Sequence, residues 1–296
     1  MYVHPMDLVR IDFDIMRQKV ITMTGWRRPE YTKKVIDNLK RCIGIEGYTI
    51  LPTIEPGYPA VLDVFNNLPN CNVVINDTRL GCGANTLKAL QRGFDISDFV
   101  IHIEDDTVPG IDSLKYLEWA NKTYENNNEI FTVTTYNRIR DIDEINPQNY
   151  FTSYRQKWYT GWMWGTWKNR FEEMSKKWNF ASWDVNINKK IRGNRYEICP
   201  TIPRSQNIGE YLGTHVRPGY WRKYHYSPIW INNIFDPSNT PISSDFSNII
   251  SNNLDLIYTE VAEPTNNLVL LEEKQLEKET LILLGILTGS TYLFFG

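Results

Sequence analysis

The chain contains 296 residues, of which 42% are apolar and 23% are charged, the composition of a globular protein that can bury a sizeable core. The formal net charge is −3 and the sequence has no strongly basic block, which disfavours nucleic acid as the main partner. The four cysteines form no C-x-x-C pair, so zinc is disfavoured and free thiols in a reducing compartment are expected, with disulfide pairing as the alternative.

Residues 1–17 are expected to form a leader or an edge element. They contain no basic segment followed by an apolar run, so no secretory signal is predicted, and no stretch of the chain has membrane-spanning length. Beyond them, strands and helices alternate. The expected strands cover 19–24, 48–54, 72–75, 99–103 and 130–136, and the expected helices cover 29–39, 59–65, 84–94 and the segment around 114–119. This alternation predicts an α/β fold with an open, mainly parallel sheet and right-handed crossovers.

Three adjacent acids, Glu104, Asp105 and Asp106, directly follow the apolar strand at 99–103. Acids at the carboxyl end of a strand lie where open α/β sheets bind their ligands. Oxygen ligands suit a hard divalent ion such as Mg²⁺ or Mn²⁺, which commonly bridges to a phosphate. An acidic, solvated turn is the alternative. Neither a G-x-G-x-x-G motif after the first strand nor a P-loop motif is present, which disfavours a dinucleotide-binding domain and a P-loop protein.

The second half of the chain is rich in aromatic and polar segments. Residues 137–157 are polar and indicate a loop, and a strand is expected at 197–202. The segment 158–168, W-Y-T-G-W-M-W-G-T-W-K, contains glycines that let backbones approach closely and rings that offer flat apolar walls. Core packing is the alternative role for these rings. Residues 237–296 are expected to form a linker and an extension, with a charged helix and a hairpin that pack on the body or on another subunit.

Five motifs follow one another in a characteristic order. They are K-V-I-T-M-T-x-x-R-R-P, I-E-D-D, G-W-M-x-x-x-W, K-W-x-x-x-x-W-D and P-x-I-x-R-x-x-x-x-G. In this order and spacing the chain resembles the N-acetylglucosaminyltransferase I family, whose members are inverting glycosyltransferases. The resemblance covers roughly Lys19–His215 and is most specific over Gly161–Asp184. It implies a GT-A fold, with a Rossmann-like, mainly parallel central sheet flanked by helices, as a catalytic domain over residues 18–236.

The resemblance implies a metal ligand and a catalytic base. Asp106 matches the residue that binds Mn²⁺ or Mg²⁺ directly, and Glu104 and Asp105 would contact metal-bound water and the ribose or sugar of a UDP-sugar donor. A cation there would stabilise the departing diphosphate. Asp184 matches the base that removes the acceptor's proton, and one base without an enzyme nucleophile gives inversion at the anomeric carbon. The alternative for Asp184 is a helix N-cap.

Four further residues are implied to bind the donor nucleotide. Arg28 lies where the family has an arginine near the nucleotide, and Glu55 where it has an acid that reads the uracil. Asn85 occupies a donor-contacting helix position at which the family carries histidine, and Arg204 lies in a segment that lines the donor site. A first-turn surface arginine and a turn acid are the alternatives for Arg28 and Glu55. His215 could contact the diphosphate or the metal.

The aromatic rings of the second half are implied to face sugar rings. Trp158, Trp162, Trp164 and Trp183 would form this wall. The family's W-D-D-W motif is shortened here, because Val185 follows Asp184 in place of the second acid.

The membrane anchor and stem of the family are not visible, so we expect a soluble relative in the cytoplasm of a bacterium or of a virus-infected cell. Its acceptor would be a glycan or a glycoprotein, and the transferred sugar could be N-acetylglucosamine. One alternative is a non-catalytic carbohydrate-binding or structural protein that forms homo-oligomers through its C-terminal tail. Another is a nucleotidyltransferase, which uses a similar sheet and similar acids.

Overall fold

The computed structural model describes residues 18–66, 68–137, 151–213, 216–226 and 259–260. The leader at 1–17, His215 and most of the expected extension at 237–296 lie outside the described residues. Within the described ranges, none of the helices combines the length and the apolar character needed to cross a bilayer.

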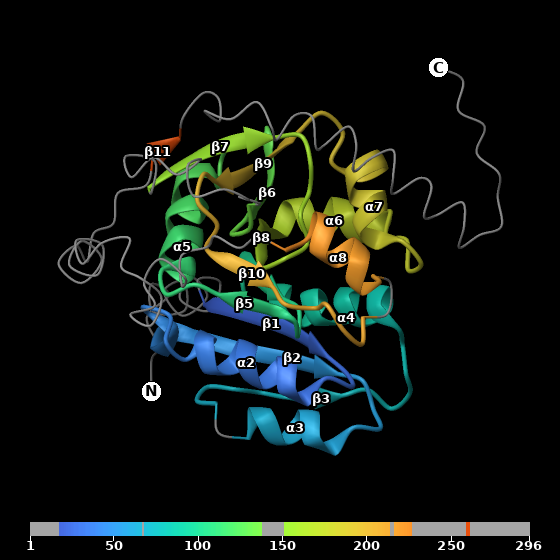
Figure 1. The fold of residues 1–296 in the computed structure, drawn as a ribbon. Coiled ribbons are helices and arrows are strands. Elements are labelled where there is room, and N and C mark those ends of the chain that lie inside the picture. Colours follow the sequence, from blue (N-terminus) through green and yellow to red (C-terminus); the bar gives the residue numbers. More distant parts are fainter. Residues whose placement is uncertain (1–17, 67, 138–150, 214–215, 227–258, 261–296) are drawn as a thin grey trace, which may run out of the picture.

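A nine-stranded sheet runs through the described part of the molecule (Figure 1). Across the sheet, the strands are β11 (Thr259–Glu260), β7 (Thr152–Gln156), β9 (Tyr196–Pro200), β6 (Ile130–Thr134), β8 (Trp164–Trp167), β4 (Phe99–Ile103), β1 (Lys19–Gly25), β2 (Tyr48–Ile54) and β3 (Val74–Ile75). β1 pairs in parallel with β2 and β4, β2 with β3, and β6 with β9. The expected mainly parallel α/β sheet is therefore confirmed.

Helices cover both faces of the sheet (Figure 1). They are α2 (Pro29–Leu39), α3 (Pro59–Phe65), α4 (Cys82–Phe94), α5 (Ser113–Tyr124), α6 (Lys168–Lys176), α7 (Trp183–Asn186) and α8 (Pro218–Tyr224), with short turns η1 (Ile45–Gly47) and η4 (Ile187–Ile191). One core cluster packs α2, α3 and α5 on one face, and the other packs α4, α6 and η4 on the opposite face. Two covered faces explain why the central strands are nearly continuous apolar runs.

The expected helix starts at two prolines are confirmed. Pro29 begins α2 and Pro59 begins α3, and neither ring displaces a hydrogen bond because the first helical N–H groups have no intrahelical partner. The expected strand at 48–54 is β2 with the same bounds.

Two strands lie where the sequence did not predict them. β7 occupies part of the segment interpreted as a loop and lies between β11 and β9, with Thr152, Ser153 and Tyr154 buried. β8 lies within the tryptophan-rich segment and is antiparallel to both of its neighbours, β4 and β6. A Cβ at Gly165 would lie 2.4 Å from Cζ of Phe99, so this glycine is what lets β8 pass so close to β4.

A small antiparallel ribbon stands beside the main sheet. It consists of β5 (Thr107–Pro109), directly after the acid triplet, and β10 (Ser205–Asn207), for which the sequence predicted no strand. The ribbon therefore brings residues 205–207 next to the acids at 104–106.

Candidate functional site

The acid triplet occupies the turn between β4 and β5 and faces Arg28, which follows the neighbouring strand β1. Nη1 of Arg28 donates to Oδ2 of Asp106 at 2.7 Å, and its Nη2 pairs with Oδ1 of Asp105. The three side chains are largely buried, with exposed fractions of 15% for Arg28, 8% for Asp105 and 10% for Asp106. The structure thus brings Arg28 to two adjacent acids from which it lies far apart in the sequence, and one guanidinium pairs with both carboxylates.

Burial and mutual repulsion shift the protonation equilibria of these groups. The pKa of Glu104 is raised well above its usual range by burial, then by Asp106 and Asp105, while Arg28 acts in the opposite direction. Burial also raises the pKa of Asp105, although Arg28 opposes the shift. The pKa of Arg28 is raised because the attraction of the two aspartates outweighs the effect of its own burial. The turn is therefore a concentration of negative charge that favours a cation.

The surroundings of Asp106 fit a cation that takes one ligand from the protein. Oδ1 of Asp106 accepts a hydrogen bond from Nδ2 of Asn207 at 3.2 Å. A Cβ at Gly209 would lie only 2.2 Å from Oδ2 of Asp106, so a glycine is needed for the backbone to lie this close to the carboxylate. Within the described residues, no three Asp, Glu, His or Cys side chains converge on one point. Mg²⁺ commonly uses one or two carboxylates and completes its shell with water and phosphate oxygens, so the donor set suits such an ion.

Glu55 and Asn85 both lie inside a hydrogen-bonded network below the loop that leads into α4. The carboxylate of Glu55, which is 5% exposed, accepts from the backbone N–H groups of Leu80 and Gly81, the latter at 2.6 Å. Nδ2 of Asn76 donates to Glu55 at 3.2 Å and to Oδ1 of Asn85 at 2.8 Å. These bonds hold the loop in place, and a direct contact of Glu55 or Asn85 with a donor stays a prediction.

An aromatic and cationic cluster that the sequence analysis did not single out lies at the same edge of the sheet. The guanidinium of Arg79 lies 3.8 Å and that of Arg27 4.6 Å from the ring centre of Trp26, and the ring of Tyr58 meets Trp26 edge-on at 5.8 Å. Trp26, Tyr58 and Arg79 follow β1, β2 and β3 respectively, and this shared position after parallel strands was the signal available in the sequence.

Arg204 lies beside the site, but its guanidinium points into the protein. It is 1% exposed and pairs with the fully buried Asp112, with Nε 3.3 Å from Oδ2. Its backbone carbonyl accepts from the N–H of Gly110, and the ribbon strand β10 begins at the next residue. The segment of Arg204 therefore borders Asp106 as expected, whereas this side chain supports the ribbon by neutralising a buried acid.

Asp184 lies exposed in the first turn of α7. The N-cap of α7 is Ser182, so the alternative interpretation of Asp184 as the N-cap is wrong. Asp184 adds to the rise in the pKa of Glu104, after burial and the two aspartates. The pKa of Cys82 is raised, chiefly because neighbouring protein atoms desolvate its thiol although the residue keeps an exposed surface, then by Glu104 and to a smaller extent by Asp184. Asp184, Glu104 and Cys82 are thus close enough to influence one another electrostatically.

The expected aromatic wall is only partly available to a sugar. Trp164 and Trp183 are 0% and 6% exposed and belong to the core on the α4 side, so their assignment to this wall was wrong. Trp158 and Trp162 are half-buried. Trp183 stacks on Trp178 with ring centres 5.2 Å apart, because its indole fills the space between α7 and the rest of the core. The alternative of core packing therefore holds for these two rings.

The mainly parallel sheet covered by helices, with a carboxylate turn after β4 and a returning ribbon beside it, fits the GT-A architecture that the motifs imply. Residues 85–240 match the GNT-I family, which is more than half of the 296-residue chain, and the chain belongs to this family. The resemblance drawn from the five motifs is therefore confirmed.

Among curated proteins, none matches the chain. Similar solved structures include residues 1–349 of TarS from S. aureus, with a TM-score of 0.48, 12% identity, and coverage of 63% of this chain and 59% of that one. The mannosyltransferase PcManGT from Pyrobaculum calidifontis, in complex with GDP-Man and Mn²⁺, gives a TM-score of 0.45 at 12% identity over 70% of this chain and 60% of that one. GalNAc-T7 with UDP, GalNAc and Mn²⁺ gives a TM-score of 0.48 at 12% identity over 69% and 48% of the two chains. This chain thus spans less than two thirds of each of these proteins.

Proposed function

We propose that the protein transfers a sugar from a UDP-sugar to a hydroxyl group of a glycan or glycoprotein acceptor, with inversion at the anomeric carbon. The observation that carries the proposal is the meeting of Arg28, Asp105 and Asp106 at the ends of β1 and β4, with Asp184 within electrostatic reach of Glu104. Membership of the GNT-I family supports sugar transfer as the class of reaction.

The acid turn supplies the donor side of the reaction. A divalent cation held by Asp106, when bound, would act as a Lewis acid on the departing diphosphate. Arg28 carries a positive charge at the same place and would hold the diphosphate by charge-assisted hydrogen bonds. Glu104 and Asp105 offer oxygens to the hydroxyl groups of the ribose or of the transferred sugar. The cluster of Trp26, Tyr58 and Arg79 offers aromatic and cationic surface to the rest of the nucleotide.

Asp184 supplies the acceptor side. Its exposed carboxylate would accept the proton of the acceptor hydroxyl as that oxygen attacks the anomeric carbon. The new C–O bond forms while the bond between the anomeric carbon and the diphosphate oxygen breaks, and UDP leaves with the bonding electrons. Because the attack is a direct displacement, the configuration of the anomeric carbon inverts.

The experiment that tests the proposal is calorimetric titration of UDP into the wild type and the Asp106→Asn variant, with and without Mn²⁺. We expect Mn²⁺-dependent binding in the wild type that weakens at least tenfold in Asp106→Asn. Asp37→Asn, an exposed carboxylate on α2 that pairs with Lys33, is the matched control and should bind like the wild type. No UDP binding to the wild type would overturn the proposal and favour the non-catalytic alternative.

A further inference from the structure

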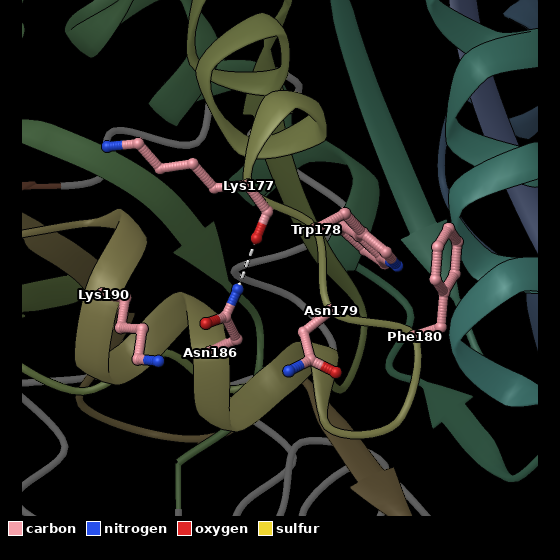
Figure 2. A pocket seen from close by; sticks show the side chains of 6 residues that line it. All are labelled: Lys177, Trp178, Asn179, Phe180, Asn186 and Lys190. Carbon is pink, nitrogen blue, oxygen red and sulfur yellow. Dashed lines mark hydrogen bonds between the residues drawn. The ribbon is translucent and has the colours of Figure 1, made fainter.

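An open pocket of about 460 Å³ lies at α7, the short helix that carries Asp184. Its lining residues come from the loop before α7, from α7 itself and from η4, and they are Lys177, Trp178, Asn179, Phe180, Asn186 and Lys190. Figure 2 shows the two rings on one side of the pocket, and Asn186 with Lys190 on the other. The pocket therefore combines a flat apolar wall with a polar and cationic wall.

The apolar wall is held in a fixed position. Nε1 of Trp178 donates to the carbonyl of Gly83 at 3.0 Å, and its ring stacks on Trp183 with an angle of 8° between the planes. A Cβ at Gly83 would lie 2.2 Å from the carbonyl oxygen of Phe180, so this loop lies directly on the start of α4. Phe180 itself keeps its ring 61% exposed. A preformed aromatic face of this kind suits the C–H face of a sugar ring.

The polar wall carries positive charge without a matching acid. Within the ranges that the structure describes, no carboxylate pairs with Lys177 or Lys190, and the adjacent Lys176 and Lys189 add two further ammonium groups that are likewise without an ion pair. On the neighbouring helix α6, Glu173 is engaged by Arg195 at 2.8 Å. Nδ2 of Asn186 donates to the carbonyl of Lys177 at 2.6 Å, which fixes the amide and points its oxygen toward the pocket side (Figure 2). This local excess of cations contrasts with the net charge of −3 for the whole chain.

From these features we infer that the pocket binds an anionic sugar, a sugar carrying a phosphate or a carboxylate, as part of the acceptor. The inference rests on the proposed function, because it assigns the acceptor side to α7, the helix that carries Asp184. The ring of the sugar stacks on Trp178 and Phe180, the amides of Asn179 and Asn186 bind its hydroxyl groups, and the lysines bind the anionic group. Asn186 follows Asp184 by two residues in α7, so a glycan anchored in the pocket would pass along the helix that carries the base.

The test is a binding measurement with glucose 6-phosphate, glucuronate and glucose as probes. The protein is first saturated with UDP and Mn²⁺, so that the phosphate of the probe cannot bind in the donor site. The Trp178→Phe variant identifies the indole N–H signal of Trp178 in the NMR spectrum. The shift of this signal on addition of each probe then measures binding. We expect glucose 6-phosphate or glucuronate to bind at least tenfold tighter than glucose, and Lys190→Glu to abolish this preference. The stronger of the two anionic probes distinguishes a phosphate from a carboxylate.

The matched control is Lys122→Glu, an exposed lysine of α5 on the opposite face of the sheet, which should keep the preference. Equal affinity for glucose and both anionic sugars would overturn the inference. An equal loss of the preference for anionic sugars in Lys190→Glu and Lys122→Glu would also overturn it. UDP titration of Lys190→Glu separates the two proposals. If UDP binds normally but the protein shows no preference for the anionic sugars, the inference is wrong and the proposed function stands. If the protein prefers the anionic sugars but binds no UDP, the proposed function alone is wrong.

Discussion

Arg28 is the residue on which the charge balance of the site depends. Its guanidinium contacts both Asp105 and Asp106 in a largely buried setting, where the two carboxylates alone would repel each other. A cation that binds Asp106 must share Oδ2 with Arg28 or displace it. Arg28 therefore stabilises the turn in the absence of a cation and competes with one at the same carboxylate.

The first prediction at this scale concerns Arg28→Met. Removing the guanidinium leaves two buried carboxylates without a counter-charge, and the free energy of unfolding should fall by about 3–5 kcal/mol. Mn²⁺ without a donor should then raise the melting temperature of the variant more than that of the wild type, because the ion replaces the lost charge. Thermal unfolding with and without Mn²⁺ measures both effects.

Lys33→Met is the matched control, since Lys33 also pairs with an aspartate on α2 but lies on the surface. An exposed pair of this kind contributes about 0.3–0.5 kcal/mol, so this variant should unfold close to the wild type. Equal stability of Arg28→Met and Lys33→Met would show that the buried pair has no such role.

At the scale of the element, β8 connects the two halves of the sheet, because it lies between β6 and β4. It runs antiparallel between β4 and β6, and the contact that permits it is the bare backbone of Gly165 against Phe99. The same strand carries Trp164, whose buried indole belongs to the core on the α4 side. The tryptophan-rich segment is therefore chiefly a structural link between the half of the sheet that carries β4, β1, β2 and β3 and the half that carries β6, β9 and β7.

Gly165→Ala should destabilise the protein by about 1–3 kcal/mol, because the new methyl group meets Cζ of Phe99 at 2.4 Å inside a packed sheet. Phe99→Leu removes that ring atom, so the cost of the alanine should be smaller in the Phe99→Leu background. Chemical denaturation of the two single variants and the double variant gives the coupling free energy. Gly219→Ala, at a position where nothing lies within 4 Å of the added methyl, is the control and should change stability little. Additive effects of the two substitutions would contradict the assigned contact.

At the scale of the whole molecule, one fully buried acid links stability to pH. Glu197 of β9 accepts from Oγ1 of Thr132 at 2.7 Å, from Nε2 of Gln156 at 2.9 Å and from the N–H of Thr160 at 2.8 Å. These bonds join β6, β7 and the loop before β8. Burial nevertheless raises the pKa of Glu197 to about 8, which the hydrogen bonds only partly oppose.

The raised pKa predicts how unfolding depends on pH. The folded state binds the proton of Glu197 more tightly than the unfolded state, so this group's contribution is complete below the unfolded value near 4.5 and is lost as pH rises toward about 8. The free energy of unfolding should therefore fall by up to about 1.4 kcal/mol per pH unit in this window. Glu197→Gln mimics the protonated acid, and its stability should exceed that of the wild type most clearly at pH 8.

The difference between the two denaturation profiles isolates Glu197 from other titrating groups. Parallel profiles from pH 5 to 8 would show that the acid remains ionised in the folded protein. Glu172→Gln, on the surface of α6, serves as the control and should leave the profile unchanged.

The local sequence pattern was enough to predict much of the half of the molecule that contains β1, β2 and β4. The apolar runs of β1, β2 and β4 each suffice to specify a buried strand, and the prolines at 29 and 59 mark helix starts through their fixed backbone angle. The acids at 104–106 were predicted to form a site because they directly follow such a strand. The family motifs then added Asp184, which no local pattern would have separated from a capping residue.

The remaining features depend on contacts between residues far apart in the chain, which periodicity does not encode. β7 is a strand because it lies beside β9, and β8 can pack against β4 because Gly165 fits against Phe99, although neither segment has a strong strand pattern of its own. Tertiary packing also decided that Trp183 is core and that Arg204 neutralises Asp112. The sequence by itself thus determined the class of fold and the acids of the site, since burial of apolar runs and strand ends are local properties. Only the tertiary structure decided which cation faces those acids, since Arg28 after β1 meets the turn after β4 through contacts between distant segments.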